Sequence, residues 1–172
     1  ASLAAFNALA TNLDSDISDA LLRDQAVNGV YNNSWGSFDN GKLHTIDATI
    51  KTAINDGLAN GRGGKGSVYV FPGGNGGCIS GQQPDASYQC PGDQDNANFD
   101  GYVNRYGVIA VCATNDRGTK SWYSEPGANL LVCGPSSNDN DSVGITTLAL
   151  LGGYRNDFNG SSAATPMVSA VA

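Results

Sequence analysis

Basic residues and histidine are scarce in this sequence of 172 residues. Nine lysines and arginines stand against 16 aspartates and glutamates, which gives a net charge of −7, and the only histidine is His44. The basic residues form no cluster that could follow a phosphate backbone, so the composition argues against a nucleic-acid partner. Because a serine nucleophile usually needs a histidine as its general base, one histidine also limits the catalytic arrangements open to this chain.

Long apolar runs are also missing. No run approaches the roughly 20 residues that span a bilayer, so no membrane segment is predicted. The first residues, ASLAAFNALATNLDSD, lack the basic region and the cleavage pattern of a signal peptide. We therefore expect a mature chain, or one cut from a longer protein.

The four cysteines are not spaced as in a metal site. Cys78 and Cys90 enclose a polar loop, CISGQQPDASYQC, which favours a disulfide bond between them. Cys112 and Cys133 lie in the apolar runs VIAVCAT and LLVCGP, where either buried thiols or a bridge between neighbouring strands fits. An even number with one loop-closing pair favours an oxidising compartment.

The residues that are present predict one α/β domain. A hydrophobic content of 40% can bury a core, and 23 glycines imply many turns and close backbone approaches. No repeat, linker or domain boundary is visible. Short apolar runs bounded by Gly, Asn and Pro alternate with segments of helical period, which is typical of a mostly parallel sheet whose strands are buried on both faces by helices.

The expected elements follow this alternation. Helices are predicted over residues 14–24, 44–61 and 161–172, the first of them opened by a capping residue. Strands are predicted over residues 29–36, 66–71, 107–114 and 129–135, followed by a hairpin over 142–154. Ligands bind beyond the carboxyl ends of parallel strands, so chemistry is expected in the loops SWGSFDNGK, FPGGNGGCISGQQ and CATNDRG.

Five segments in order carry a resemblance to a known family. They are SWG at 34–36, GRGGKGSVYVFPGGNGG at 61–77, NFDGYVN at 98–104, WYSEPGANLLV at 122–132 and GSSAATP at 160–166. Together they resemble the subtilisin-like serine proteases, and within these the kexin and furin branch. The resemblance implies a three-layer α/β fold, here incomplete at both ends, a polypeptide substrate, and a secreted or secretory-pathway protein.

The resemblance assigns two catalytic residues. Ser162 matches the nucleophile of the G-T-S-x-x-x-P pattern, with Ser161 in place of the usual threonine, and Asn75 matches the asparagine of the oxyanion hole. A donor aimed at the developing oxyanion is worth about 2.7–4 kcal/mol. Taken alone, Ser162 could be a small residue chosen for helix packing and Asn75 a turn residue among glycines; the other segments favour the catalytic interpretation.

The resemblance also assigns a metal site and a substrate pocket. Asp39, Asp95 and Glu125 match a calcium site beneath the pocket for the substrate's P1 side chain. Asp39 and Asp100, with Ser34, Trp35 and Gly36, match substrate-binding positions. Hard oxygen ligands suit calcium, and negative charge in a narrow pocket selects Arg or Lys. The alternative is a solvated acidic surface. Trp35 and Trp122 are expected to pack against other side chains.

The chain departs from the family pattern in several positions. Ala97 and Gly127 stand where convertases have cysteines, and Phe38 stands where they often have an acid. The acid expected a few residues after GK is either shifted to Asp47 or lost. A preference for a basic residue at P4 is therefore not predicted.

The larger departure is that the catalytic aspartate and histidine motifs, which precede the SWG strand in this family, have no match. His44 follows SWG and is not assigned as the base; it is expected at the surface or at a helix N-terminus. The chain is interpreted as the C-terminal part of one subtilase catalytic domain, residues 1–172, with aspartate and histidine supplied by another segment or chain. Alone it is expected to keep at most residual activity. The alternative function is a catalytically inactive binding or structural module.

Overall fold

The computed structural model describes residues 2–78, 94–138 and 143–172. The chain divides into two compact units, Ala1–Tyr31 with Ile46–Tyr69, and Asn32–Thr45 with Val70–Ala172. The boundary passes through two strands, β1 (Val30–Asn32) and β2 (Val68–Pro72). We call the two parts unit 1 and unit 2, and describe each by itself.

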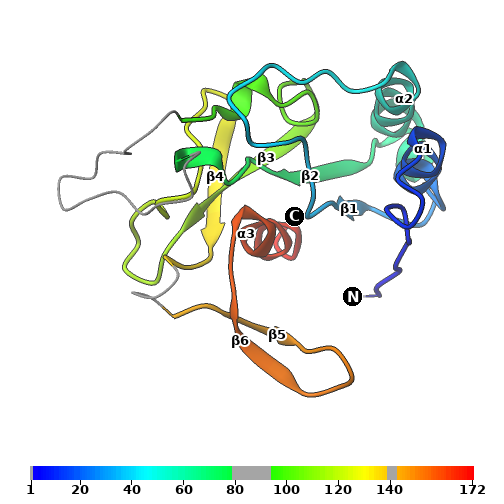
Figure 1. Ribbon diagram of the computed structural model, residues 1–172. Coiled ribbons are helices and arrows are strands. Elements are labelled where there is room, and N and C mark those ends of the chain that lie inside the picture. The colour runs from blue at the N-terminus through cyan, green and yellow to red at the C-terminus, as the bar shows by residue number, and fades with distance from the viewer. Residues whose placement is uncertain (1, 79–93, 139–142) are drawn as a thin grey trace. The chain divides into compact units, whose positions relative to one another are not determined.

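Strands β1 to β4 form a four-stranded sheet of order β1-β2-β3-β4 (Figure 1), in which β3 (Val108–Thr114) pairs in parallel with β4 (Leu130–Pro135). This confirms the predicted α/β class with a mostly parallel sheet. The prediction of burial on both faces holds for the centres of β2 and β3 but is wrong for β4. Because β4 is the last strand of the sheet, its Leu131 is 84% exposed.

Unit 1 is built on two helices, α1 (Asp14–Leu22) and α2 (Ala48–Gly64), which pack on one another. Its core contains Ile50 and Ile54, and the hydroxyl of buried Tyr69 donates to the carbonyl of Leu21 at 2.6 Å. The residue that precedes α1, Leu13, makes no side-chain cap, so the predicted capping residue is wrong.

The second helix begins later than predicted. The Asp47 carboxylate accepts a hydrogen bond from Thr49 N at 2.7 Å, which satisfies one of the N–H groups that have no intrahelical partner. Residues 44–47 therefore lie outside α2, and His44 instead forms an isolated parallel bridge with Asp100.

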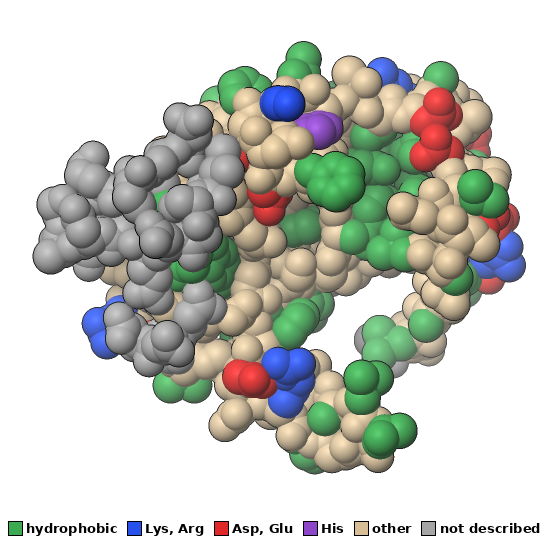
Figure 2. Space-filling model, in the orientation of Figure 1, with side chains coloured by type: hydrophobic (Ala, Val, Ile, Leu, Met, Phe, Trp, Pro, Cys, Tyr) green, Lys and Arg blue, Asp and Glu red, His purple; other side chains and the backbone are tan. Residues whose placement is uncertain are grey.

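Unit 2 carries the remaining elements. Helix α3 (Ser161–Ser169) packs against β3 and β4, and glycine is required at Gly134 because a Cβ there would lie 2.4 Å from the carbonyl oxygen of Ala164. An antiparallel hairpin of β5 (Ile145–Leu148) and β6 (Tyr154–Phe158) precedes α3, as predicted, although residue 142 lies outside the described residues. Apolar side chains lie exposed along this hairpin (Figure 2).

A disulfide bond joins β3 to β4. Cys112 and Cys133 lie opposite one another on β3 and β4 and are bonded, which decides between the two alternatives left open for this pair. The predicted partner of Cys78, Cys90, lies outside the described residues. In the part of the chain that the structure describes, no helix has the length and apolar character needed to cross a membrane.

Candidate active site and acidic cluster

The turn before α3 presents Ser162 at the start of a helix. Gly160 is the residue before the helix and has a φ of 84°, a left-handed conformation that favours glycine. A Cβ at this position would also lie 3.4 Å from Asn75 Oδ1. Because the first N–H groups of a helix have no intrahelical partner, the backbone N–H of Ser162 is available to an anion at this point.

Asn75 is held beside this turn through its amide oxygen. Ser161 donates to Asn75 Oδ1 twice, from its backbone N–H at 2.7 Å and from its hydroxyl at 2.9 Å. A backbone N–H can only donate, so this contact fixes which end of the amide faces Ser161. The NH₂ end of an exposed side chain is thereby left for another acceptor, next to Ser162.

Ser162 and Ser34 are joined in both directions. Ser162 Oγ donates to the carbonyl of Ser34 at 3.2 Å, and Ser34 Oγ donates to the carbonyl of Ser162 at 3.0 Å. These bonds hold the predicted substrate-binding segment 34–36 against α3. A carbonyl oxygen is not a base strong enough to take the serine proton. Among the described residues, Ser162 Oγ has no hydrogen bond to a histidine or a carboxylate.

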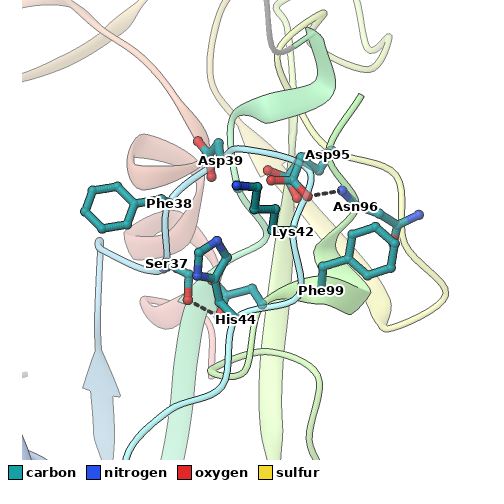
Figure 3. Close-up of a pocket in the computed structure, with 11 residues that line it drawn as sticks. Ser37, Phe38, Asp39, Lys42, His44, Asp95, Asn96 and Phe99 are labelled. Carbon is teal, nitrogen blue, oxygen red and sulfur yellow. Dashed lines mark hydrogen bonds between the residues drawn. The ribbon is translucent and has the colours of Figure 1, made fainter. Parts of the chain in front are cut away.

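His44 makes contacts away from the nucleophile. Its Nε2 bonds Asn40 Oδ1 at 2.8 Å, and its ring lies 6.4 Å from that of Phe38. It lines a small pocket in which the ring of Phe38 is directed away from the acidic groups (Figure 3). This placement agrees with the prediction that His44 is not the general base.

The three acids predicted as metal ligands converge. Asp39, Asp95 and Glu125 come from three separate loops, and one carboxylate oxygen from each lies within 4.8 Å of the others. Asp95 and Glu125 are only 4% and 3% exposed. A solvated acidic surface, the alternative from the sequence, does not describe these two residues. The cluster lines the pocket of Figure 3.

The loop that carries Asn75 rests on this cluster. Asp39 Oδ2 accepts from Asn75 N at 3.1 Å, and Glu125 Oε1 accepts from Gly76 N at 3.0 Å. Gly74 has a φ of 97°, and a Cβ on it would lie 2.2 Å from Glu125 Oε1. Glycine is therefore required at Gly74 and Gly76 because acidic side chains approach the backbone here, and the two hydrogen bonds connect the acidic cluster to the loop of Asn75.

The charges of the cluster repel one another in a buried place. Burial, with the neighbouring charges of Asp39 and Asp95, raises the pKa of Glu125 to about 8. Burial likewise raises the pKa of Asp39, with Asp95 and Asp100 contributing to the increase. A divalent cation would remove this repulsion, and three carboxylates are the hard oxygen ligands that calcium takes. The donor set thus fits such an ion.

Asp100 lies in the same pocket but has protein partners. Its carboxylate accepts from Ser37 N at 3.0 Å, from Ser37 Oγ at 3.1 Å and from Tyr102 N at 2.7 Å. A Cβ on Gly36 would lie 2.9 Å from Asp100 Oδ2. Asp100 therefore shapes the segment that follows Ser34, and glycine at position 36 permits its approach.

Both tryptophans pack on aromatic rings, as expected. Trp35 contacts Phe71 and Tyr102 edge-on, with ring centroids 5.3 and 4.9 Å apart. Trp122 lies edge-on to Tyr123 at 5.6 Å. Within the predicted segment 34–36, packing of the Trp35 side chain thus fixes the position of the neighbouring backbone.

Two residues near the nucleophile were not singled out from the sequence. The hydroxyls of Tyr123 and Ser136 meet each other at 2.7 Å and both bond Gly160. The tyrosine was visible only as part of WYSE, and nothing about Ser136 in CGPSS indicated a role.

Comparison with known proteins identifies the family. The sequence profile described as the subtilase family, Peptidase_S8, matches residues 7–172. The chain belongs to the subtilase family. It is 31% identical over 168 residues to furin-like protease 1, isoform 1-CRR, of Drosophila melanogaster, covering 93% of this chain and 14% of that protein.

One further relative supports the assignment, and one solved structure shows the same fold. The dibasic-processing endoprotease of Schizosaccharomyces pombe is 33% identical over 159 residues, which is 92% of this subtilase chain and 20% of the relative. The structure of the Aeromonas sobria serine protease with its chaperone ORF2 matches with a TM-score of 0.73 and 21% identity, over 95% of this chain and 34% of that one. The chain thus spans a fifth or less of these two curated relatives.

Proposed function

We propose that this chain is part of a serine endopeptidase in which Ser162 is the nucleophile and Asn75 stabilises the oxyanion. The observation that carries the proposal is the double hydrogen bond from Ser161 to Asn75 Oδ1. It turns the donor end of the amide toward an acceptor beside Ser162, at a helix start whose N–H groups favour negative charge.

In the proposed reaction, Ser162 Oγ attacks the carbonyl carbon of the scissile peptide bond, and its proton goes to a histidine supplied by another segment or chain. The oxyanion accepts from Asn75 Nδ2 and from the backbone N–H of Ser162. The histidine then protonates the leaving amine, and water releases the acyl group by the reverse sequence. The bond from Ser162 Oγ to Ser34 O must break when this base is in place.

We propose that the substrate residue before the cleaved bond is Arg or Lys. The support is a pocket lined by Asp39, Asp95, Asp100 and Glu125, and a relative whose name describes it as dibasic-processing. Negative charge at a concave, partly buried site favours a cation. At P4 no basic preference is proposed, because Phe38, 82% exposed, stands where an acid is frequent in convertases.

We further propose calcium at Asp39, Asp95 and Glu125. The ion would supply positive charge that offsets three buried carboxylates, and the hydrogen bonds from Asn75 N and Gly76 N connect this place to the oxyanion loop. We also propose a location in the secretory pathway. The Cys112–Cys133 bond supports it, because disulfides persist in oxidising compartments.

Labelling with a fluorophosphonate tests the nucleophile. The longest gene product that contains this chain is incubated with the probe in calcium, and peptide mapping locates the adduct; we expect it on Ser162. Ser162→Ala should abolish the label, whereas Ser37→Ala, a serine on the pocket side of the same unit, should keep it. Hydrolysis of matched fluorogenic peptides with Arg, Lys, Leu or Glu at P1 then tests specificity.

An inactive module is the second candidate, because Ser162 Oγ is bonded to a carbonyl and not to a base. A folded gene product that takes no label at Ser162 would establish that alternative. If Ser162 takes the label but peptide hydrolysis shows no preference for Arg or Lys at P1, the endopeptidase stands and the proposed P1 pocket is rejected.

A further inference from the structure

A buried tyrosine lies between the two parts of the site without a role in the reaction proposed above. Tyr123 is 4% exposed, and its backbone carbonyl accepts from Gly77 N at 2.8 Å. Gly77 is two residues after Asn75. The other end of Tyr123 reaches the nucleophile turn, where its hydroxyl accepts from Gly160 N at 3.1 Å.

The hydrogen bonds around this hydroxyl have only one consistent direction. Ser136 Oγ donates its single proton to the carbonyl of Gly160 at 2.8 Å, so it must accept from Tyr123 OH at 2.7 Å. Tyr123 OH in turn accepts from Gly160 N, because an N–H can only donate. Tyr123, Ser136 and Gly160 thus form a closed ring in which both backbone groups of Gly160 are held.

Gly160 needs such restraint. It has a φ of 84°, and glycine has the widest choice of backbone conformations of any residue. Its conformation decides where Ser161 and Ser162 start the helix, and Ser161 holds the amide of Asn75. A rotation at Gly160 would therefore move the nucleophile and release the oxyanion donor together.

We infer that Tyr123 is a positioning residue that sets the separation of Ser162 from Asn75, through its hydroxyl on one side and its carbonyl on the other. The inference deepens the proposed endopeptidase function and rests on it. Tyr123 itself touches no reacting atom. Its effect is on geometry, and a misplacement of about 1 Å at a reacting centre costs about 100-fold in rate.

Tyr123→Phe is the direct test, because it keeps the ring and the carbonyl and removes only the hydroxyl. The matched control is Tyr69→Phe in unit 1, which also removes one buried tyrosine hydroxyl, in this case one that donates to the carbonyl of Leu21. Both variants should lower the unfolding temperature, since each loses buried hydrogen bonds, and Tyr123→Phe should lower it more because its hydroxyl bonds Ser136 Oγ, Gly160 N and Ser137 N. Only Tyr123→Phe should lower kcat, by between about 10- and 100-fold, with KM within about twofold.

Ser136→Ala is the second variant, in case Tyr123→Phe does not fold. It breaks the same ring from the other side and should lower kcat to a similar extent. Because the two hydroxyls act as one unit, the double variant should be no slower than about the slower single variant. Equal kcat values in Tyr123→Phe, Tyr69→Phe and the unchanged protein would overturn the inference.

Amide hydrogen exchange separates failure of this inference from failure of the proposed function, because it needs no catalysis. In the folded chain, Tyr123→Phe should raise the exchange rate at Gly160 by about tenfold or more relative to Tyr69→Phe, since the N–H loses its acceptor. Unchanged protection at Gly160 refutes the positioning role even if the protein hydrolyses peptides. Faster exchange at Gly160 in Tyr123→Phe, in a protein that takes no label at Ser162, supports the restraint of Gly160 by Tyr123 and rejects the endopeptidase.

Discussion

At the scale of single residues, Asn75 is held at two points, the amide oxygen of its side chain and its backbone N–H. Its amide oxygen is held by Ser161, and its backbone N–H donates to Asp39. Both bonds hold the side chain in place, and neither of them involves the N–H groups of its Nδ2. Preorganised donors of this kind require no rearrangement when charge develops on the substrate oxygen, which is why they stabilise a transition state more than water does.

Asn75→Ala should therefore lower kcat by about 10²–10³-fold with little change in KM, measured on an Arg-containing peptide. Ser161→Ala should have a smaller effect, because the Asn75 amide loses the hydroxyl donor and keeps the backbone N–H of residue 161. Ser161→Thr keeps the hydroxyl and serves as the control with nearly full activity. A change in KM alone for Asn75→Ala would contradict an oxyanion role.

Glu125 links stability to pH when no cation is bound. Its pKa rises from an ordinary value of 4.5 to about 8 on folding, so the folded state holds its proton more tightly than the unfolded state. The resulting stability is present below pH 4.5 and is lost as the pH rises through 8. Asp39, whose pKa is also raised, acts in the same direction.

In a chelator, the free energy of unfolding from urea titrations should therefore fall between about pH 5 and pH 8.5. Glu125→Gln should flatten this slope, because the amide does not titrate. Asp157→Asn, which removes an exposed carboxylate of unit 2, should leave the slope in place. A metal-free protein whose stability rises over this range would contradict the raised pKa.

At the scale of elements, β3 and β4 are joined twice, by their backbone ladder and by Cys112–Cys133. The two cysteines are 21 residues apart in sequence. Closing a loop of this length removes conformational freedom mainly from the unfolded chain. Ser136 directly follows Pro135, the last residue of β4. A well-ordered end of this strand therefore also helps to hold the hydrogen-bonded ring at Gly160.

Cys112→Ala with Cys133→Ala should lower the free energy of unfolding by about 3 kcal/mol, the value expected for loops of this size. Denaturant titration of the oxidised proteins measures it. Cys133 is exposed at its end of the bond, so a dithiol should reproduce the loss in the unchanged protein. The double variant under the same reductant is the control, and any remaining response reports other cysteines. A loss below about 1 kcal/mol would contradict the expected cross-link effect.

At the scale of the whole molecule, the chain consists of two compact units with different contents. Unit 1 has a helical core around α1 and α2, whereas unit 2 contains Ser162, Asn75 and the acidic cluster. Any ligand of the acidic cluster therefore acts on unit 2 directly. A ligand bound only by the folded form adds stability that grows with its concentration.

Calcium at 100 times its dissociation constant should add about 2.7 kcal/mol of stability. Hydrogen exchange should show new protection in segments 74–77 and 94–96 of unit 2, with α1 and α2 less affected. Glu125→Gln should remove the calcium effect and Asp157→Asn should preserve it. Protection that appears equally in both variants would place the ion elsewhere.

Local patterns in the sequence were enough for most of the fold. The pattern of the apolar residues located α1, α2 and the buried strands β2 and β3, because one face of each element must leave water. The start of α2 and the burial of β4 were predicted wrongly, for different reasons. Asp47 offered a better cap than His44 for α2, and β4 lies at the end of the sheet, a position that its apolar sequence does not reveal.

The sequence by itself determined the family and the order of elements and led to the proposed roles of Ser162 and Asn75, because these depend on motifs and on periodicity along the chain. Only the tertiary structure decided that Asp39, Asp95 and Glu125 converge, that Cys112 bonds Cys133, and that Tyr123 and Ser136 enclose Gly160. The partners in that ring are 24 and 37 positions apart in the chain. Directed hydrogen bonds between such distant residues are fixed by how strands and loops pack, and no local pattern encodes that packing.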